Sequence, residues 1–175
     1  MSQFWNGQGN ICLSDPNILA CKDALELLQQ LIDSGAKVEF NQGLDARLIT
    51  PEKAELLARM SLKLPHFAMD SMSSVKTVKR GLKLYVDAYK RINGKWNWRN
   101  CKVFVLTNFD TTHEQDMERI HVIQECECWP YIMIYNKKTA PKITRRLQRW
   151  TNNPICYAKT KDFDEYQRFT YKKPL

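Results

Sequence analysis

Short runs of apolar and β-branched residues alternate along the chain with longer stretches in which apolar residues recur at helical spacing. Strand-like runs occur at residues 10–14, 37–41, 64–69, 102–106 and 131–135. A stretch with helical periodicity follows each of them, as strands and helices do in βα units around a parallel sheet. The pattern therefore predicts an α/β protein with about five parallel strands.

Several residues mark where the predicted helices begin. Thr50 and Pro51 supply an N-cap and a first-turn proline for the second helix. Thr111 and Glu114 have the spacing of a capping box at the start of the fourth helix. The fifth helix is expected to start around Pro141. The weaker apolar segment 155–158 is a candidate for one further strand.

Length and composition favour one domain with a packed core. The chain has 175 residues, of which 43% are hydrophobic. We expect a single domain over 1–175, with a core of about 10–150 and a C-terminal extension over 151–175. No apolar run is long enough to span a membrane, and MSQFWNGQGN lacks the features of a signal peptide, so we expect a cytoplasmic protein without a membrane partner.

The six cysteines have irregular spacing, so we expect reduced thiols and no disulfide framework. Three lie in apolar, strand-like runs and are expected to act as small hydrophobic residues: Cys12, Cys101 and Cys156. Cys126 and Cys128 form a C-x-C pair that can chelate a soft metal, but His121 leaves a tetrahedral ligand set incomplete. We therefore expect no metal site.

Each predicted strand ends in polar residues, and in parallel βα architectures these ends meet at one rim where ligands bind. Loops are often polar for no other reason than exposure, but five such ends together indicate a site for a charged ligand. Arg47 offers a fork for a carboxylate and Asp45 can accept an amine or a ribose hydroxyl, or the two pair with each other. His66, inside the third strand, is more typical of a core residue than of a catalyst.

The segment SDPNILACKDALELLQQLIDSGAKVEFNQGLDARLITPEKAELLARM resembles the middle of radical S-adenosylmethionine (radical SAM) proteins, especially the methylthiotransferase-like branch. The likeness runs from about Asn10 to Trp150 and rests on the segment Leu48 to Glu52, the polar strand ends and the order of the units. It implies an incomplete (β/α) barrel, whose five strands correspond to strands 2–6 of a partial (β/α)6 TIM-like barrel.

The resemblance also implies S-adenosylmethionine as the cofactor. Asp15 would then lie where the family contacts the methionine amino group, and Asp45 and Arg47 would flank the cofactor. Asp70 lies where the family often has an acidic residue, although the neighbouring glycine is absent here. Catalytic residues remain unassigned. The expected cofactor-binding set is Asp15, Asn17, Gln42, Asp45, Arg47, Asp70 and Asn108.

The family binds a [4Fe–4S] cluster through a C-x-x-x-C-x-x-C motif, which this chain lacks. We expect the cluster in the complete family protein, not on this chain. The leading interpretation is therefore a fragment or half that holds S-adenosylmethionine and substrate, inactive alone and dependent on a cluster-bearing N-terminal segment or chain. Another interpretation is a truncated gene product that folds but has no function.

A second interpretation, of a different class, is a non-catalytic nucleic-acid-binding module. The net charge of +8 permits a polyanionic partner. Trp150, with Trp96 and Trp98, would stack on unpaired bases. Alternatively, the basic residues lie on the solvated face of the fifth helix, and Trp150 packs inward. The basic residues that would neutralise phosphates are Lys138, Lys142, Arg145, Arg146 and Arg149.

Overall fold

Five parallel strands form the centre of the protein, as the alternating pattern predicts. The computed structural model describes residues 5–160 and 162–171. β1 pairs with β2, and β3, β4 and β5 form a second sheet, so the strands follow their order in the chain. Two isolated parallel bridges, Val38 with Leu62 and Leu44 with Phe67, lie between the two sheets. The strands are β1 (Asn10–Leu13), β2 (Lys37–Phe40), β3 (His66–Ala68), β4 (Lys102–Thr107) and β5 (Trp129–Ile134).

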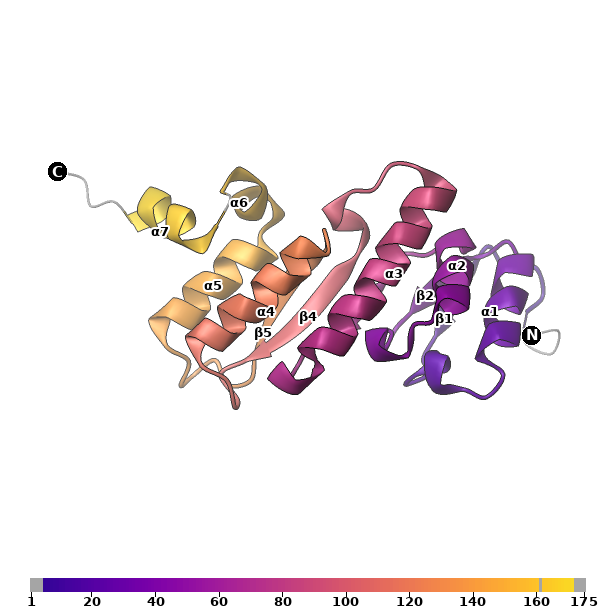
Figure 1. Ribbon diagram of the computed structural model, residues 1–175, viewed down its shortest axis with the longest axis horizontal. Coiled ribbons are helices and arrows are strands. Elements are labelled where there is room, and N and C mark those ends of the chain that lie inside the picture. The colour runs from indigo at the N-terminus through magenta and orange to yellow at the C-terminus, as the bar shows by residue number, and fades with distance from the viewer. Residues whose placement is uncertain (1–4, 161, 172–175) are drawn as a thin grey trace.

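One helix follows each strand, and these five helices lie side by side on the same face of the strands (Figure 1). Among the described residues, no helix is long and apolar enough to cross a membrane. The helices are α1 (Ala24–Asp33), α2 (Pro51–Arg59), α3 (Val75–Asn93), α4 (His113–Glu125), α5 (Lys142–Asn152), α6 (Pro154–Lys159) and α7 (Phe163–Tyr171). Short 3-10 turns also occur: η1 (Ile18–Ala20), η2 (Ala46–Leu48), η3 (Met72–Ser74) and η4 (Trp98–Asn100).

The side chains of each strand alternate between the helix layer and the opposite face. Val103 and Val105 of β4 and Ile132 of β5 point toward the helices and are buried. Phe104 between them is half-buried, and Met133 is exposed. Because successive residues of a strand face opposite sides, the core lies between the strands and the five helices, while the other face is covered less completely.

Two of the expected local features are wrong. The capping box of α4 is made by Thr112 and Gln115, one residue later than expected, because the Thr111 hydroxyl instead donates a hydrogen bond to Asp116. The segment 155–158 is part of helix α6 and not a strand. Asn153 caps that helix by accepting hydrogen bonds from the Ile155 and Cys156 amides.

The cysteines are all free, but only some are buried. Cys101 is buried, as expected, and Cys156 packs against the core as a small hydrophobic residue, although it lies in helix α6 and not in a strand. Cys12 is exposed, so the prediction for that residue is wrong. Burial raises the pKa of the Cys126 thiol to about 12. Among the described residues, no group of three or more histidine, cysteine or acidic side chains is arranged to hold a metal ion.

Helix α3 approaches the η2 turn so closely that only glycine fits at one position. A Cβ atom added to Gly81 would lie 1.8 Å from the carbonyl oxygen of Ala46. This is far inside van der Waals contact, and the atom it meets is backbone that cannot rotate away. The contact fixes the position of η2 relative to α3.

We predict that Gly81→Ala destabilises the fold by about 1–3 kcal/mol through overpacking, although alanine normally favours a helix over glycine by about 1 kcal/mol. Urea denaturation measures the change. Gly9→Ala is the control, because a Cβ at Gly9 meets nothing within 4 Å. A Gly81→Ala protein as stable as the unaltered chain would contradict the close approach.

Candidate functional site

A cavity of about 370 Å³ lies at the carboxyl ends of β2 and β3 and is lined mostly by residues of the loops that follow the first three strands. Its polar lining includes Asn17 after β1, Gln42, Asp45 and Arg47 after β2, and Asp70 after β3. The structure thus brings five of the seven expected cofactor-binding residues to one place. Its volume falls within the range of about 300–1,000 Å³ that is typical of small-molecule sites.

Asp45 and Arg47 are paired with each other across the turn that η2 forms. Arg47 donates from Nε to Oδ1 of Asp45 at 2.9 Å and from Nη2 to Oδ2 at 2.7 Å. The hydrogen bond from the Arg47 side chain lowers the pKa of Asp45, so the carboxylate is ionised at neutral pH. The Arg47 side chain is 59% exposed and Asp45 only 18%. Arg47 Nη1 makes no hydrogen bond within the described chain and keeps its donors for a ligand.

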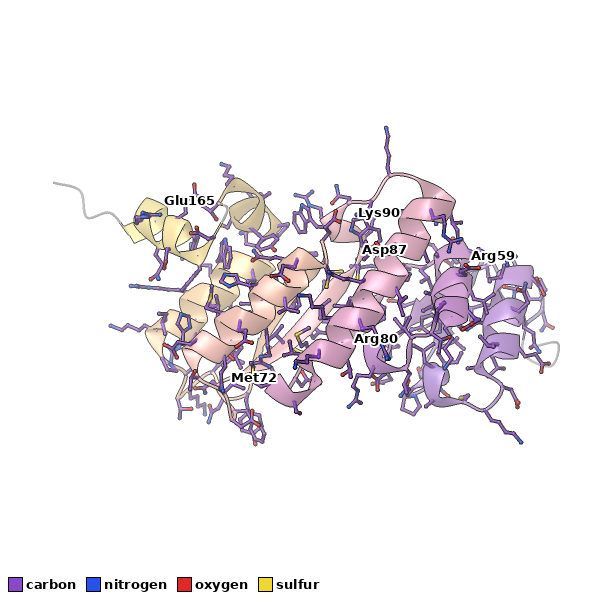
Figure 2. The ribbon with its side chains drawn as sticks, in the orientation of Figure 1. Arg59, Met72, Arg80, Asp87, Lys90 and Glu165 are labelled. Carbon is purple, nitrogen blue, oxygen red and sulfur yellow. The ribbon has the colours of Figure 1, made fainter. Side chains whose placement is uncertain are left out.

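The loop that carries this pair is held from several sides. Arg80 of α3, labelled in Figure 2, donates to the Arg47 carbonyl at 3.1 Å. Lys53 donates to the carbonyls of Leu19 and Leu48 at 2.8 and 3.3 Å. Gly43 has a φ of +82°, and a Cβ there would lie 3.0 Å from the His66 ring. These contacts fix the Asp45–Arg47 pair before any ligand arrives.

Asn17 contributes a hydrogen-bond acceptor with no donor. Its Oδ1 atom is buried and makes no hydrogen bond within the described residues. Its backbone amide donates to Asp15 at 2.8 Å, so the Asp15 carboxylate shapes the turn that presents Asn17. A buried acceptor without a donor costs free energy unless a ligand or water supplies one.

Two of the expected residues do not line this cavity: Asp15 and Asn108. Asp15 is exposed in the turn after β1. Asn108 follows β4 with a φ of +60° and donates from its side chain to the Asn136 carbonyl at 3.2 Å. It therefore joins the loops at the carboxyl ends of β4 and β5.

The wall of the cavity also includes aromatic residues, which the pattern of polar strand ends does not predict. His66 and Phe104 both line it, with their rings edge to face at 5.2 Å between centroids. Both belong to the strand face opposite the helices. The alternation of side chains along a strand could have indicated this position for His66 and Phe104. Phe67 and Val103 face the helices, so their neighbours in the strands must face the other way.

Arg119 of α4 is a second residue that sequence patterns miss. It is fully buried and donates to the carbonyls of Met69 and Asp70 at 2.9 Å each and to the Leu106 carbonyl at 2.8 Å. It also donates to Asp116, whose pKa is raised by burial against the opposing effect of its hydrogen bonds. Arg119 therefore links α4 to the carboxyl ends of β3 and β4.

The basic residues proposed for nucleic-acid contact differ in exposure from Trp150, which lies beside them in the chain. Lys138, Lys142, Arg145 and Arg149 are exposed and Arg146 is half-buried. Trp150 is fully buried, and its indole donates to Thr160 at 2.8 Å, so it is not available to stack on a base.

The two other tryptophans of that interpretation are also packed against aromatic neighbours. The ring centroids of Trp96 and Tyr89 are 5.0 Å apart, and those of Trp98 and Tyr157 are 5.1 Å apart.

Comparisons with known protein families, curated proteins and solved structures returned no match for this chain.

We predict that Arg119→Met destabilises the protein by about 3 kcal/mol or more, because it leaves the Asp116 carboxylate buried without its partner. Chemical denaturation is the measurement. The control is Arg91→Met, which breaks the exposed ion pair with Glu55, 2.7 Å in length. That change should cost less than about 1 kcal/mol. Equal losses for the two variants would show that Arg119 is not the internal link described above.

Proposed function

We propose that this chain is the ligand-holding part of a radical SAM-type barrel and binds S-adenosylmethionine in the cavity at the carboxyl ends of β2 and β3. The single observation that carries the proposal is the convergence of Asn17, Gln42, Asp45, Arg47 and Asp70 on that cavity. Five parallel strands in chain order with helices on one face support the interpretation as an open barrel (Figure 1).

The polar groups match the chemistry of this ligand. S-adenosylmethionine carries an ammonium, a carboxylate, a sulfonium and ribose hydroxyls. Asp70 and Asp45 offer carboxylates for cationic groups and hydroxyls, and the exposed guanidinium of Arg47 offers a fork for the carboxylate. The buried Oδ1 of Asn17 can accept a hydrogen bond from the ammonium or a hydroxyl.

The described residues do not fit an iron–sulfur cluster. The cavity has no cysteine in its lining, and Cys101 and Cys128 are buried at the amino ends of β4 and β5, opposite the cavity's end of the strands. We therefore assign no radical step to this chain. Its own part is to bind and orient the ligand, and cleavage requires a cluster supplied from elsewhere.

We predict saturable binding of S-adenosylmethionine by isothermal titration calorimetry. Asp70→Asn and Arg47→Gln should each weaken it about tenfold or more, since hydrogen bonds to charged groups contribute about 1.5–3 kcal/mol. The matched controls are Asp87→Asn and Arg59→Gln, which change the same groups away from the cavity (Figure 2). These two variants should bind as the unaltered protein does.

Two results would contradict the proposal. The first is absence of binding by a folded sample at millimolar ligand. The second is equal weakening by the cavity variants and by their controls, which would indicate an effect of charge alone. Competition by methionine and by adenosine, tested separately, shows which end of the ligand the cavity holds.

A further inference from the structure

An exposed aromatic pair stands at the carboxyl ends of β4 and β5, away from the cavity. Phe109 and Tyr135 are 61% and 64% exposed, with ring centroids 4.8 Å apart. The two rings in contact form a contiguous exposed apolar surface, and such surfaces can mark interaction sites. The loops that carry the two rings are joined next to them, because the side chain of Asn108 donates to the backbone carbonyl of Asn136.

A basic hollow of about 800 Å³ lies between β5 and α5, and its lining includes Ile134 and Lys137, which flank Tyr135 in the chain. Met133 and Ile155 provide exposed apolar side chains in its lining. Lys137, Arg145 and Arg149 provide the positive charge. The hollow therefore combines apolar contact with cations, which suits a partner that has flat apolar groups and negative charges.

The positive charge of the whole chain is concentrated in this region. Residues 128–161 contain eight of the 27 lysines and arginines and none of the 19 acidic residues, so the rest of the chain holds 19 of each sign. Within the described residues, none of the cations that line the hollow makes an ion pair. Because positive and negative residues balance over the rest of the chain, the excess of positive charge is a specific feature of the β5–α5 segment.

The free edge of β5 is closed to an added peptide strand. Ile132 donates its amide to Oδ1 of Asn152 at 2.7 Å and accepts from Nδ2 of the same residue at 3.0 Å. Gln148 donates to the same carbonyl at 3.0 Å, and Pro130 has no amide hydrogen to offer. Because strand addition needs free backbone groups, this edge does not favour an extended peptide.

We propose that the Phe109–Tyr135 pair and the basic hollow bind single-stranded nucleic acid. Unpaired bases stack on the two exposed rings, and phosphates lie against Lys137, Arg145 and Arg149. A duplex keeps its bases stacked on one another and leaves the rings unused. An acidic peptide matches the charge but supplies no planar groups for the rings. This surface does not depend on the cavity at β2 and β3.

The test is fluorescence anisotropy of the full chain with labelled oligo(dT) and oligo(U). Phe109→Ala with Tyr135→Ala should weaken binding about fivefold or more, because base–aromatic stacking contributes at least about 1 kcal/mol per base. Phe109→Tyr with Tyr135→Phe keeps the rings and should keep the affinity. Both positions are exposed, so the fold should tolerate the changes.

Arg145→Gln with Arg149→Gln should lower the slope of log affinity against log salt by about 1.4, or about 0.7 for each lost phosphate contact. The control is Lys22→Gln with Lys76→Gln, which removes the same charge from exposed sites outside the hollow and should leave the slope unchanged.

Several results would overturn the inference. Absence of oligonucleotide binding at low salt is one, and binding of a duplex or of polyglutamate as tight as that of oligo(dT) is another, since it would indicate charge alone. Equal loss in the Lys22 and Lys76 control is a third. S-adenosylmethionine binding by the same variants should be unchanged, so failure of this inference is distinguishable from failure of the proposed function.

Discussion

The hydrogen bonds of the buried Arg119 side chain are the interaction on which the geometry of the site depends. Parallel strands end with carbonyl groups that have no further ladder partner, and buried carbonyls need donors. One guanidinium supplies them to Met69 and Asp70 after β3 and to Leu106 in β4, while Asp116 balances its charge. The ends of β3 and β4 at this rim are therefore held by a buried side chain of α4. This explains how short, polar loops can present a defined cavity.

The η2 turn is fixed by a second constraint of a different kind. Gly81 lets the backbone of α3 touch the backbone at Ala46, and Arg80 next to it holds the Arg47 carbonyl. Packing and hydrogen bonding thus act on the same turn from one helix. As a result, the Asp45–Arg47 pair is positioned by the scaffold and pays little conformational entropy when a ligand binds.

The order of the strands and helices could be predicted because hydrophobic periodicity is a local signal. The polar strand ends were also predictable, and the ends of the first three strands bring five of the expected residues to one cavity, whereas the ends of β4 and β5 do not line it. Arg119 could not be found this way, because Asp116 and Arg119 have the spacing of an ordinary surface pair on a helix. Gly81 looks like any helix glycine until α3 is placed on η2.

The errors also have physical causes. Ile155 to Ala158 is apolar enough for a strand, but the cap by Asn153 and the proline after it start a helix. Trp150 lies among basic residues in sequence, yet helical spacing turns it to the core beside Leu147.

The two proposed surfaces have opposite charge character, and this separates their ligands. S-adenosylmethionine has two positive groups and one negative group, so its net charge suits a cavity in which Asp45 and Asp70 outnumber Arg47. The same charge is repelled by the basic hollow between β5 and α5. The hollow suits an anionic ligand instead, because Lys137, Arg145 and Arg149 line it.

The most direct test of the central claim is hydrogen–deuterium exchange of the backbone amides with and without saturating S-adenosylmethionine. A ligand in the cavity should slow exchange in residues 41–49 and 68–74, which surround it, and leave α5 unchanged. Protection confined to other regions, or none at saturating ligand, would contradict the assignment of this cavity as the S-adenosylmethionine site.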